Sequence, residues 1–407
     1  MGTVLLLIIY LAFISLGLPD SLLGAAWPVM RPDLGAPLGT AGLLSLTVSV
    51  GTILSSLASG AVIERFGTGR VTLISCLMTA TALLGYSYAP SVAWLIICAI
   101  PLGLGAGSVD AALNHYVATH YKAHHMSWLH SFWGVGATTG PVIMAAFLSR
   151  DGDWRHGYLT VALIQFSLVV LLFVTLRLWD RQAATESADS PTVQPEAEAA
   201  VQNGGSRTAN GLTYALGSFL FYCGVELTVG LWGSSYLVNV KGLLVGDAAR
   251  WVSLYYAGIT IGRFVTGFAT FKVSNRHLIR AGQMTALAGT LLLLLPLPTG
   301  FALAGFLITG LGLAPIYPSM LHETPVRFGE KHAQRIMGYQ MAVAYVGSTL
   351  MPPLLGLLAG FWSIGLFPLY VALSAAAMLL CTEWLNVILA GSSRPRRFRP
   401  GHGPSRS

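Results

Sequence analysis

The sequence predicts an all-helical membrane protein in which twelve transmembrane helices form two six-helix halves related by pseudo-two-fold symmetry. Three observations predict this fold class. The 407 residues are 54% hydrophobic and only 10% charged, twelve apolar stretches recur along the chain, and one polar stretch divides them into two sets of six. A soluble chain would carry roughly a quarter charged residues, so most of this surface is expected to face lipid.

The composition also limits the function classes. Low charge and high apolar content exclude a disordered chain and a nucleic-acid-binding module, despite the net charge of +7. No G-x-S-x-G elbow or H-E-x-x-H pair is present, so we expect no enzyme, no cofactor and no metal site. The glycines at 103, 105 and 107 lie in an apolar stretch with no preceding strand, which favours close helix packing over a nucleotide loop.

A helix that crosses the hydrocarbon core needs roughly 20 mostly apolar residues. The first half is expected to span at 4–29, 39–62, 71–90, 93–119, 127–149 and 157–179. The second half is expected to span at 211–238, 248–271, 278–297, 299–322, 335–361 and 363–390. The domain organisation is then an N-terminal bundle, a polar cytoplasmic linker, a C-terminal bundle and a basic tail, at 1–179, 180–210, 211–391 and 392–407.

The basic residues predict the topology. Seventeen of the 23 fall on the side of the N-terminus, five fall on the other side, and Arg263 alone lies within a span. Because positive charge accumulates in cytoplasmic loops, both termini are expected to be cytoplasmic. We expect a multi-pass plasma membrane protein that functions as a monomer in the lipid bilayer.

The two halves resemble each other in sequence. The fourth expected span contains Gly103, Gly105 and Gly107, and the tenth contains Gly310 and Gly312. Two repeated halves around a central path are typical of secondary transporters, whose substrate site lies near the midplane between the halves.

The loop after the second span carries a recognisable motif. It reads Gly60-Ala-Val-Ile-Glu64-Arg65-Phe-Gly67-Thr-Gly-Arg70. This resembles the G-x-x-x-D-R-x-G-R-R signature of the major facilitator superfamily, with glutamate in place of aspartate. Its glycines would allow close helix approach, and its charged side chains would form a cluster at the cytoplasmic gate.

Three acidic residues remain deep within expected spans, namely Asp20, Asp110 and Glu226. Carboxyl groups are costly inside a bilayer, so they are functional candidates by default. A carboxyl group away from water takes up a proton readily, and all three are therefore candidates for proton coupling. The alternative is structural, in which each acid caps a broken helix or pairs with Arg263.

Helical spacing gives two of these acids neighbours. Asn114 lies one turn after Asp110, and its amide suits a hydroxylated ligand. Asp20 shares a face with Gly17 and Gly24, which are expected to leave space beside the carboxylate for a polyol. Asp20 is therefore a candidate for substrate binding as well as for proton coupling. Glu226 is a further candidate for substrate binding.

A closer resemblance rests on the same residues. The stretch Asp110-Ala-Ala-Leu-Asn114-His115-Tyr116 is similar to the E-T-A-A-N-P-Y element of the fucose permease branch, a family of sugar:proton symporters. Here the acid is shortened and His115 replaces proline. The resemblance implies that Asp110 carries the proton and that Asp20 and Asn114 bind substrate.

Aromatic and polar side chains on the cavity-lining spans complete the candidate site. Aromatic rings stack on the C–H faces of sugars, although each ring also suits helix packing or the interfacial belt. The substrate-binding candidates of this group are His130, Trp133, Trp232, Tyr255, Tyr256, Tyr317 and Gln340.

These features predict a secondary active transporter that works by alternating access. We expect proton-coupled symport of a neutral hydroxylated solute such as a monosaccharide, and sodium coupling stays open. The alternative is a proton-coupled efflux antiporter of lipophilic or cationic compounds, since buried acids and aromatic rings suit those as well. A membrane sensor or a lipid flippase on the same fold is a third class.

Overall fold

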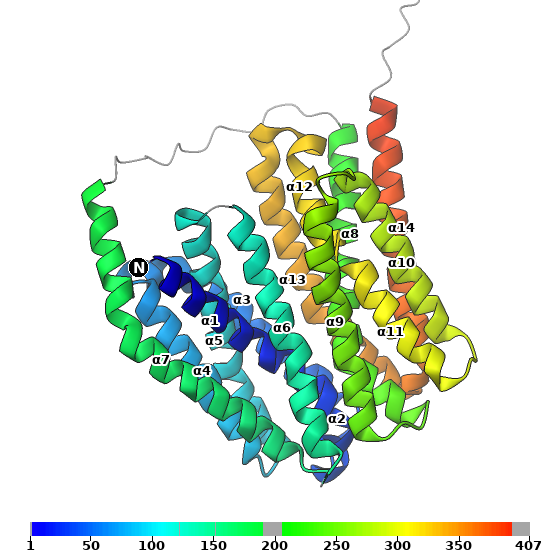
Figure 1. Cartoon of the computed structure of the whole chain (residues 1–407). Helices are drawn as coiled ribbons and strands as arrows, with labels where there is room; N and C mark the ends of the chain where they lie inside the picture. The colour runs from blue at the N-terminus through cyan, green and yellow to red at the C-terminus, as the bar shows by residue number, and fades with distance from the viewer. Residues whose placement is uncertain (1, 122, 151, 190–205, 393–407) are drawn as a thin grey trace, which may run out of the picture.

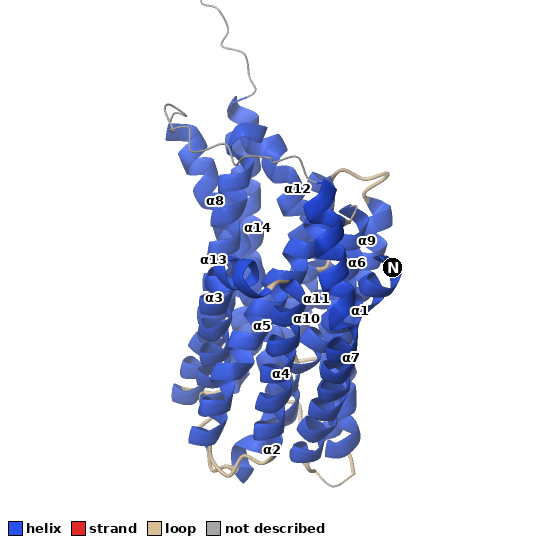
Figure 2. Cartoon of the chain, turned by 90° about the vertical axis from the view of Figure 1, so that its left-hand side faces the viewer, coloured by secondary structure: helices blue, strands red, loops and turns tan. Residues whose placement is uncertain are grey.

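The computed structural model describes residues 2–121, 123–150, 152–189 and 206–392. Within them every regular element is helical, which confirms the expected fold class (Figure 2). The N-terminal half contains α1 (Gly2–Asp20), α2 (Leu22–Asp33), α3 (Thr40–Phe66), α4 (Thr68–Ser87), α5 (Val92–His120), α6 (Ala123–Leu148) and α7 (Trp154–Asp189). The C-terminal half contains α8 (Ser206–Asn239), α9 (Val245–Ala269), α10 (Asn275–Leu294), α11 (Thr299–Leu313), α12 (Ile316–Phe328), α13 (Glu330–Phe361), a 3-10 turn (Ile364–Leu366) and α14 (Phe367–Ser392).

Each of the twelve expected spans corresponds to one helix or to a broken pair. The first span consists of α1 and α2, and the tenth consists of α11 and α12. In the described part of the chain, ten helical stretches are long and apolar enough to cross a membrane. Helices α9 and α10 are not among the ten, and α10 carries Arg276 and Arg280 in its first two turns.

The helices extend into the expected linker. Helix α7 continues to Asp189 and α8 begins at Ser206, so both ends of the stretch 180–210 are helical. Ala183 and Ala184 favour this continuation, since alanine has the highest helix propensity. The rest of that stretch, Lys122 and the expected basic tail after Ser392 lie outside the described residues.

Small residues set the spacing of helices within each half. A Cβ atom added to Gly103 or Gly107 would lie 2.2 Å from a backbone oxygen of α3, that of Val48 or Thr52. Thr52 also donates its hydroxyl to the Gly103 carbonyl at 3.2 Å. In the other half, a Cβ atom on Gly310 would lie 2.2 Å from the backbone oxygen of Tyr255. The expected role of the glycines at 103, 105 and 107 in close helix packing is confirmed.

The two halves contact each other along α6 and α9, whereas α3 and α13 meet on one side of the bundle only. We call the side where α7 ends and α8 begins the linker side, and the opposite side the loop side (Figure 1). On the loop side α2 packs on α8, and the first turns of α3 pack on the end of α13. There, a Cβ atom on Gly42 would lie 2.8 Å from Pro353.

The same two helices separate towards the linker side. Gly60 of α3 and Gly338 of α13 are both exposed, and a Cβ atom on either would have no neighbour within 4 Å. The ribbons of the two halves diverge in this direction in Figure 1. Helices α3 and α13 therefore pack together on the loop side and are apart on the linker side.

The glycine contacts predict the stability of variants. Gly103→Ala should destabilise the fold by about 1–3 kcal/mol, because its methyl group overlaps the backbone of α3. Gly60→Ala is the matched control, since the space around Gly60 is open and alanine favours a helix. Thermal unfolding of both variants in detergent checks this, and a Gly103→Ala midpoint equal to that of Gly60→Ala would contradict it.

Candidate functional site

Asp20 lies at the break in the first span. Pro19 has no N–H to continue the helical hydrogen bonding, α1 ends at Asp20, and α2 begins at Leu22. The carboxylate is exposed although Leu18 and Ser21 on either side are buried. Its Oδ2 atom accepts a hydrogen bond from Nε1 of Trp133 on α6 at 2.8 Å. The break therefore presents an acceptor to the space between the halves.

Gly17 and Gly24 do not provide the expected space beside Asp20. A Cβ atom on Gly17 would lie 2.1 Å from the carbonyl oxygen of Trp133, and one on Gly24 would lie 2.1 Å from that of Gly230. The prediction that these glycines make room for a polyol is wrong. They instead allow the backbones of α6 and α8 to approach the first span.

Asp110 and Asn114 form one unit on α5. The Asn114 amide donates to the Asp110 carboxylate at 2.9 Å and to its backbone carbonyl at 3.0 Å. Both side chains are half-buried. The carboxylate of Asp110 lies within electrostatic reach of Asp20 and of Tyr317 and Tyr345 in the other half. The predicted pairing of acid and amide on one helix face is confirmed.

Glu226 is held by a basic partner. Its Oε1 atom accepts from the guanidinium of Arg263 on α9 at 2.9 Å, and the same guanidinium donates to the Tyr222 hydroxyl at 3.3 Å. Only 10% of the Glu226 side chain and 15% of the Arg263 side chain are exposed. Glu226 thus pairs with Arg263, which is the structural alternative that the sequence left open.

Trp133 joins these groups across the two halves. Its N–H bonds to Asp20, while its ring lies under the Arg263 guanidinium at 5.4 Å and meets the Tyr256 ring edge-on at 6.5 Å. We call Asp20, Trp133, Glu226 and Arg263 the central cluster. Indole N–H donors favour carboxylates and indole faces favour guanidinium groups, so Trp133 satisfies a negative and a positive side chain at once.

Two other predicted residues lie near this cluster. His130 of α6 is half-buried and meets the ring of Phe13 edge-on at 5.8 Å. Tyr317 packs against the Tyr222 ring at 5.9 Å and donates its hydroxyl to the Met341 sulfur at 3.0 Å. No cluster of three metal-ligating side chains occurs among the described residues.

Two predicted aromatic residues belong to the packed core instead. Trp232 is fully buried and donates its N–H to the Pro352 carbonyl at 2.8 Å. Tyr255 is fully buried as well and donates its hydroxyl to the Glu226 carbonyl at 3.0 Å. Their polar atoms are thus occupied by the backbone in this conformation.

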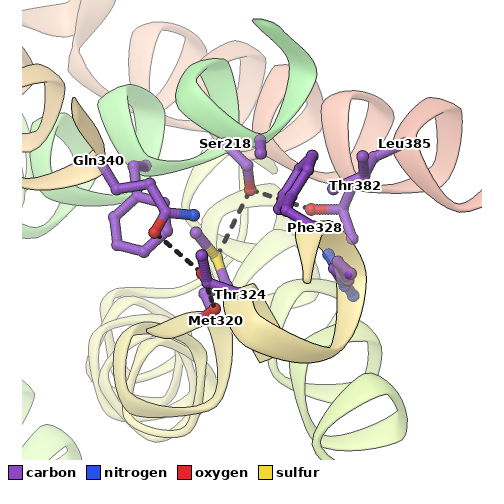
Figure 3. Close-up of a pocket in the computed structure, with 10 residues that line it drawn as sticks. Ser218, Met320, Thr324, Phe328, Gln340, Thr382 and Leu385 are labelled. Atoms are coloured by element: carbon purple, nitrogen blue, oxygen red, sulfur yellow. Dashed lines mark hydrogen bonds between the residues drawn. The ribbon is translucent and has the colours of Figure 1, made fainter. Parts of the chain in front are cut away.

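Gln340 belongs to a different place in the C-terminal half. It accepts a hydrogen bond from the Thr324 hydroxyl at 2.9 Å and lines a small pocket that also contains Ser218, Arg327 and Thr382 (Figure 3). The pocket encloses about 10 Å³, roughly the space of one water molecule. The structure does not bring Gln340 into the central cluster.

The gate motif lies at the turn between α3 and α4. Gly67 has φ +78°, which glycine adopts freely, so it allows the turn rather than a close helix contact. Within the described residues, Glu64, Arg65 and Arg70 form no ion pair, although the Arg65 guanidinium lies 5.5 Å from the Phe66 ring. Gly60 has no close neighbour in this conformation, so its expected close approach is not seen, and the role of the charged residues at a closed gate stays a prediction.

Sequence reasoning missed the roles of three residues. Arg263 was noticeable as the one basic residue within an expected span, but nothing in the sequence shows that it joins Glu226 to Trp133. Tyr222 and Tyr345 were not among the candidate site residues. Their positions depend on which helix faces meet across the two halves.

Comparison with known proteins identifies the family. The sequence model of the Major Facilitator Superfamily matches residues 9–322. The chain belongs to this superfamily. Bypass of stop codon protein 6 of Saccharomyces cerevisiae is 23% identical and aligns over 91% of this chain and 80% of its own length.

Two bacterial relatives carry transport names. The cis,cis-muconate transport protein of Acinetobacter baylyi is 23% identical, over 88% of this chain and 87% of its own length. The glucose/mannose transporter of Bacillus subtilis is 21% identical, over 87% of this chain and 86% of its own length. The solved D-xylose-proton symporter has a TM-score of 0.71 at 14% identity and covers 94% of this chain and 96% of its own. At this identity the likeness shows the fold, and the resemblance to the fucose permease branch stays a prediction.

The ion pair between Glu226 and Arg263 predicts how single and double variants change the stability of the protein. Glu226→Gln should destabilise the protein by about 3–5 kcal/mol, because it leaves a largely buried guanidinium without its counter-ion. The double variant Glu226→Gln with Arg263→Gln should recover much of this loss. Arg250→Gln, which removes an exposed pair with Asp247, should cost at most about 1 kcal/mol. Thermal unfolding in detergent compares the variants, and additive losses in the double variant would contradict the pairing.

Proposed function

We propose that the chain is a proton-coupled symporter that takes up a neutral hydroxylated solute of monosaccharide size by alternating access. The observation that supports this most strongly is the Asp110–Asn114 pair, half-buried beside the space between the halves. A carboxyl group in such a place changes its protonation as water enters and leaves. The neighbouring amide offers donors and an acceptor to hydroxyl groups.

Each side chain has a proposed role. Asp110 carries the proton, while Asp20 and Asn114 accept and donate hydrogen bonds to the solute. The Trp133 ring supplies a stacking face beside Asp20. Glu226 neutralises Arg263, so it positions Trp133 rather than carrying the proton.

The charge balance favours a neutral solute over an anion. Arg263 is the basic residue of the central cluster, and its guanidinium is already paired with Glu226. An anion would therefore meet the carboxylates of Asp20 and Asp110 with no free cation in the cluster. The names of the glucose/mannose transporter and the D-xylose-proton symporter support the same solute class, whereas the muconate transport protein represents an anionic one.

The excess of basic residues on the linker side supports a cytoplasmic location for both termini in a plasma membrane. In that orientation the described conformation faces inward. When the linker side closes, Glu64, Arg65 and Arg70 would come together with the opposite half and hold the gate.

Transport in vesicles tests the proposal. Purified protein is reconstituted with an internal pH dye and given glucose, mannose, xylose and fucose in turn. At least one sugar should drive proton entry, and Asp110→Asn should reduce this flux at least about tenfold while sugar counterflow survives, because only the proton carrier is lost. Glu383→Gln, an acid paired with Arg280 away from the cluster, is the control and should transport normally.

Two results would contradict the proposal. Proton release driven by tetraphenylphosphonium, with no response to any sugar, would assign the protein to efflux of lipophilic cations. Loss of counterflow in Asp110→Asn would make Asp110 a substrate ligand instead of the proton carrier.

A further inference from the structure

The Asp110–Asn114 pair offers only acceptors to a ligand in this conformation. The Asn114 amide uses both of its N–H groups, one on the Asp110 carboxylate at 2.9 Å and one on the Asp110 backbone carbonyl at 3.0 Å. The second carboxylate oxygen of Asp110 and the side-chain carbonyl oxygen of Asn114 accept no hydrogen bond from the described residues. Both side chains are only half-buried. A ligand that binds here must therefore supply the hydrogen-bond donors.

The pair also carries a negative charge that no base neutralises. Among the described residues, no basic side chain lies within 4.0 Å of the carboxylate of Asp110 or Asp20. Arg263 is paired with Glu226, and the Trp133 N–H that bonds to Asp20 is a neutral donor. Asp20 and Asp110 lie within electrostatic reach of each other, so their ionised forms repel. A positive charge bound at Asp110 is therefore stabilised by both acids.

A neutral sugar and the coupling proton meet these two needs together. A proton on Asp110 removes the charge, supplies an O–H donor and weakens the hold on the Asn114 amide, which then becomes available to the sugar. A protonated primary amine brings one positive charge and three N–H donors within a single molecule. At Asp110 the ammonium group therefore replaces the proton instead of adding to it.

We propose that the site also carries 2-amino sugars, in their protonated form and without a coupled proton. This inference rests on the proposed symport and extends its substrate class to vicinal amino alcohols. The ammonium group pairs with the ionised Asp110 carboxylate, and the adjacent sugar hydroxyl donates to the Asn114 carbonyl oxygen one helical turn away. The amine thus supplies the charge that a neutral sugar takes from the coupling proton.

The free acceptors separate this class from lipophilic cations. A quaternary ammonium or phosphonium ion has no N–H donor, so it leaves the free oxygens of Asp110 and Asn114 without partners. A primary ammonium group forms charge-assisted hydrogen bonds, which are stronger than neutral ones. The pair therefore favours a hydrophilic amine that also carries a hydroxyl group. The parent sugar is the matched neutral ligand, since it differs only by a hydroxyl in place of the amine.

Counterflow of matched sugars tests the inference. The reconstituted protein is given glucose, mannose, xylose and fucose, each beside its 2-amino derivative, at a mildly acidic pH that keeps the amine protonated. For a sugar that the wild type exchanges, the amino derivative should exchange as well. Asp110→Asn should slow exchange of the amino derivative at least about tenfold, because the ammonium loses its counter-ion, while exchange of the parent sugar survives. Glu383→Gln should exchange both like the wild type.

An internal pH dye gives a second readout on the wild type. The pH is equal on both sides, and potassium with valinomycin clamps the membrane potential. Entry of the parent sugar should acidify the lumen, whereas entry of the amino derivative at a matched rate should not, because the ammonium ion takes the place of the proton. Protein-free vesicles correct for diffusion of the uncharged amine. If Asp110→Asn does not fold, this measurement still decides.

The outcomes distinguish this inference from the symport on which it rests. Parent-sugar transport with no exchange of the amino derivative would overturn the inference alone. Equal acidification by both sugars, or amine exchange that Asp110→Asn leaves unchanged, would do the same. Absence of transport of all four parent sugars would overturn the symport and the inference together.

Discussion

The structure depends on how one positive charge is accommodated within a membrane-spanning bundle. An unpaired guanidinium in such surroundings is strongly unfavourable, and Arg263 resolves this through Glu226, Tyr222 and the face of Trp133. Because Arg263 lies against the Trp133 ring and holds its orientation, the Trp133 N–H points towards the Asp20 carboxylate and donates a hydrogen bond to it. The orientation of an acid in the first span is thus determined by a base in the eighth.

Glycine contacts decide where the halves separate. On the loop side, Gly24 and Gly42 bring the halves into backbone contact. On the linker side, Gly60 and Gly338 occupy the same two helices, α3 and α13, with nothing against them. Small residues at both ends of one helix pair allow close packing at either end, but a rigid pair cannot close both at once. The proposed alternating access therefore needs only a change in which end of the pair is closed.

Sequence reasoning reached the fold and part of the site. Apolar length predicted a helix or a broken pair for each of the twelve expected spans, and helical spacing placed Asn114 beside Asp110 correctly, since both residues lie on one helix. It failed where two helices meet. The space expected beside Gly24 is filled by α8, Gln340 faces Thr324 instead of the centre, and the partner of Glu226 stayed undecided. Periodicity fixes the face of a helix that a residue occupies, but contacts between the halves depend on the tertiary arrangement.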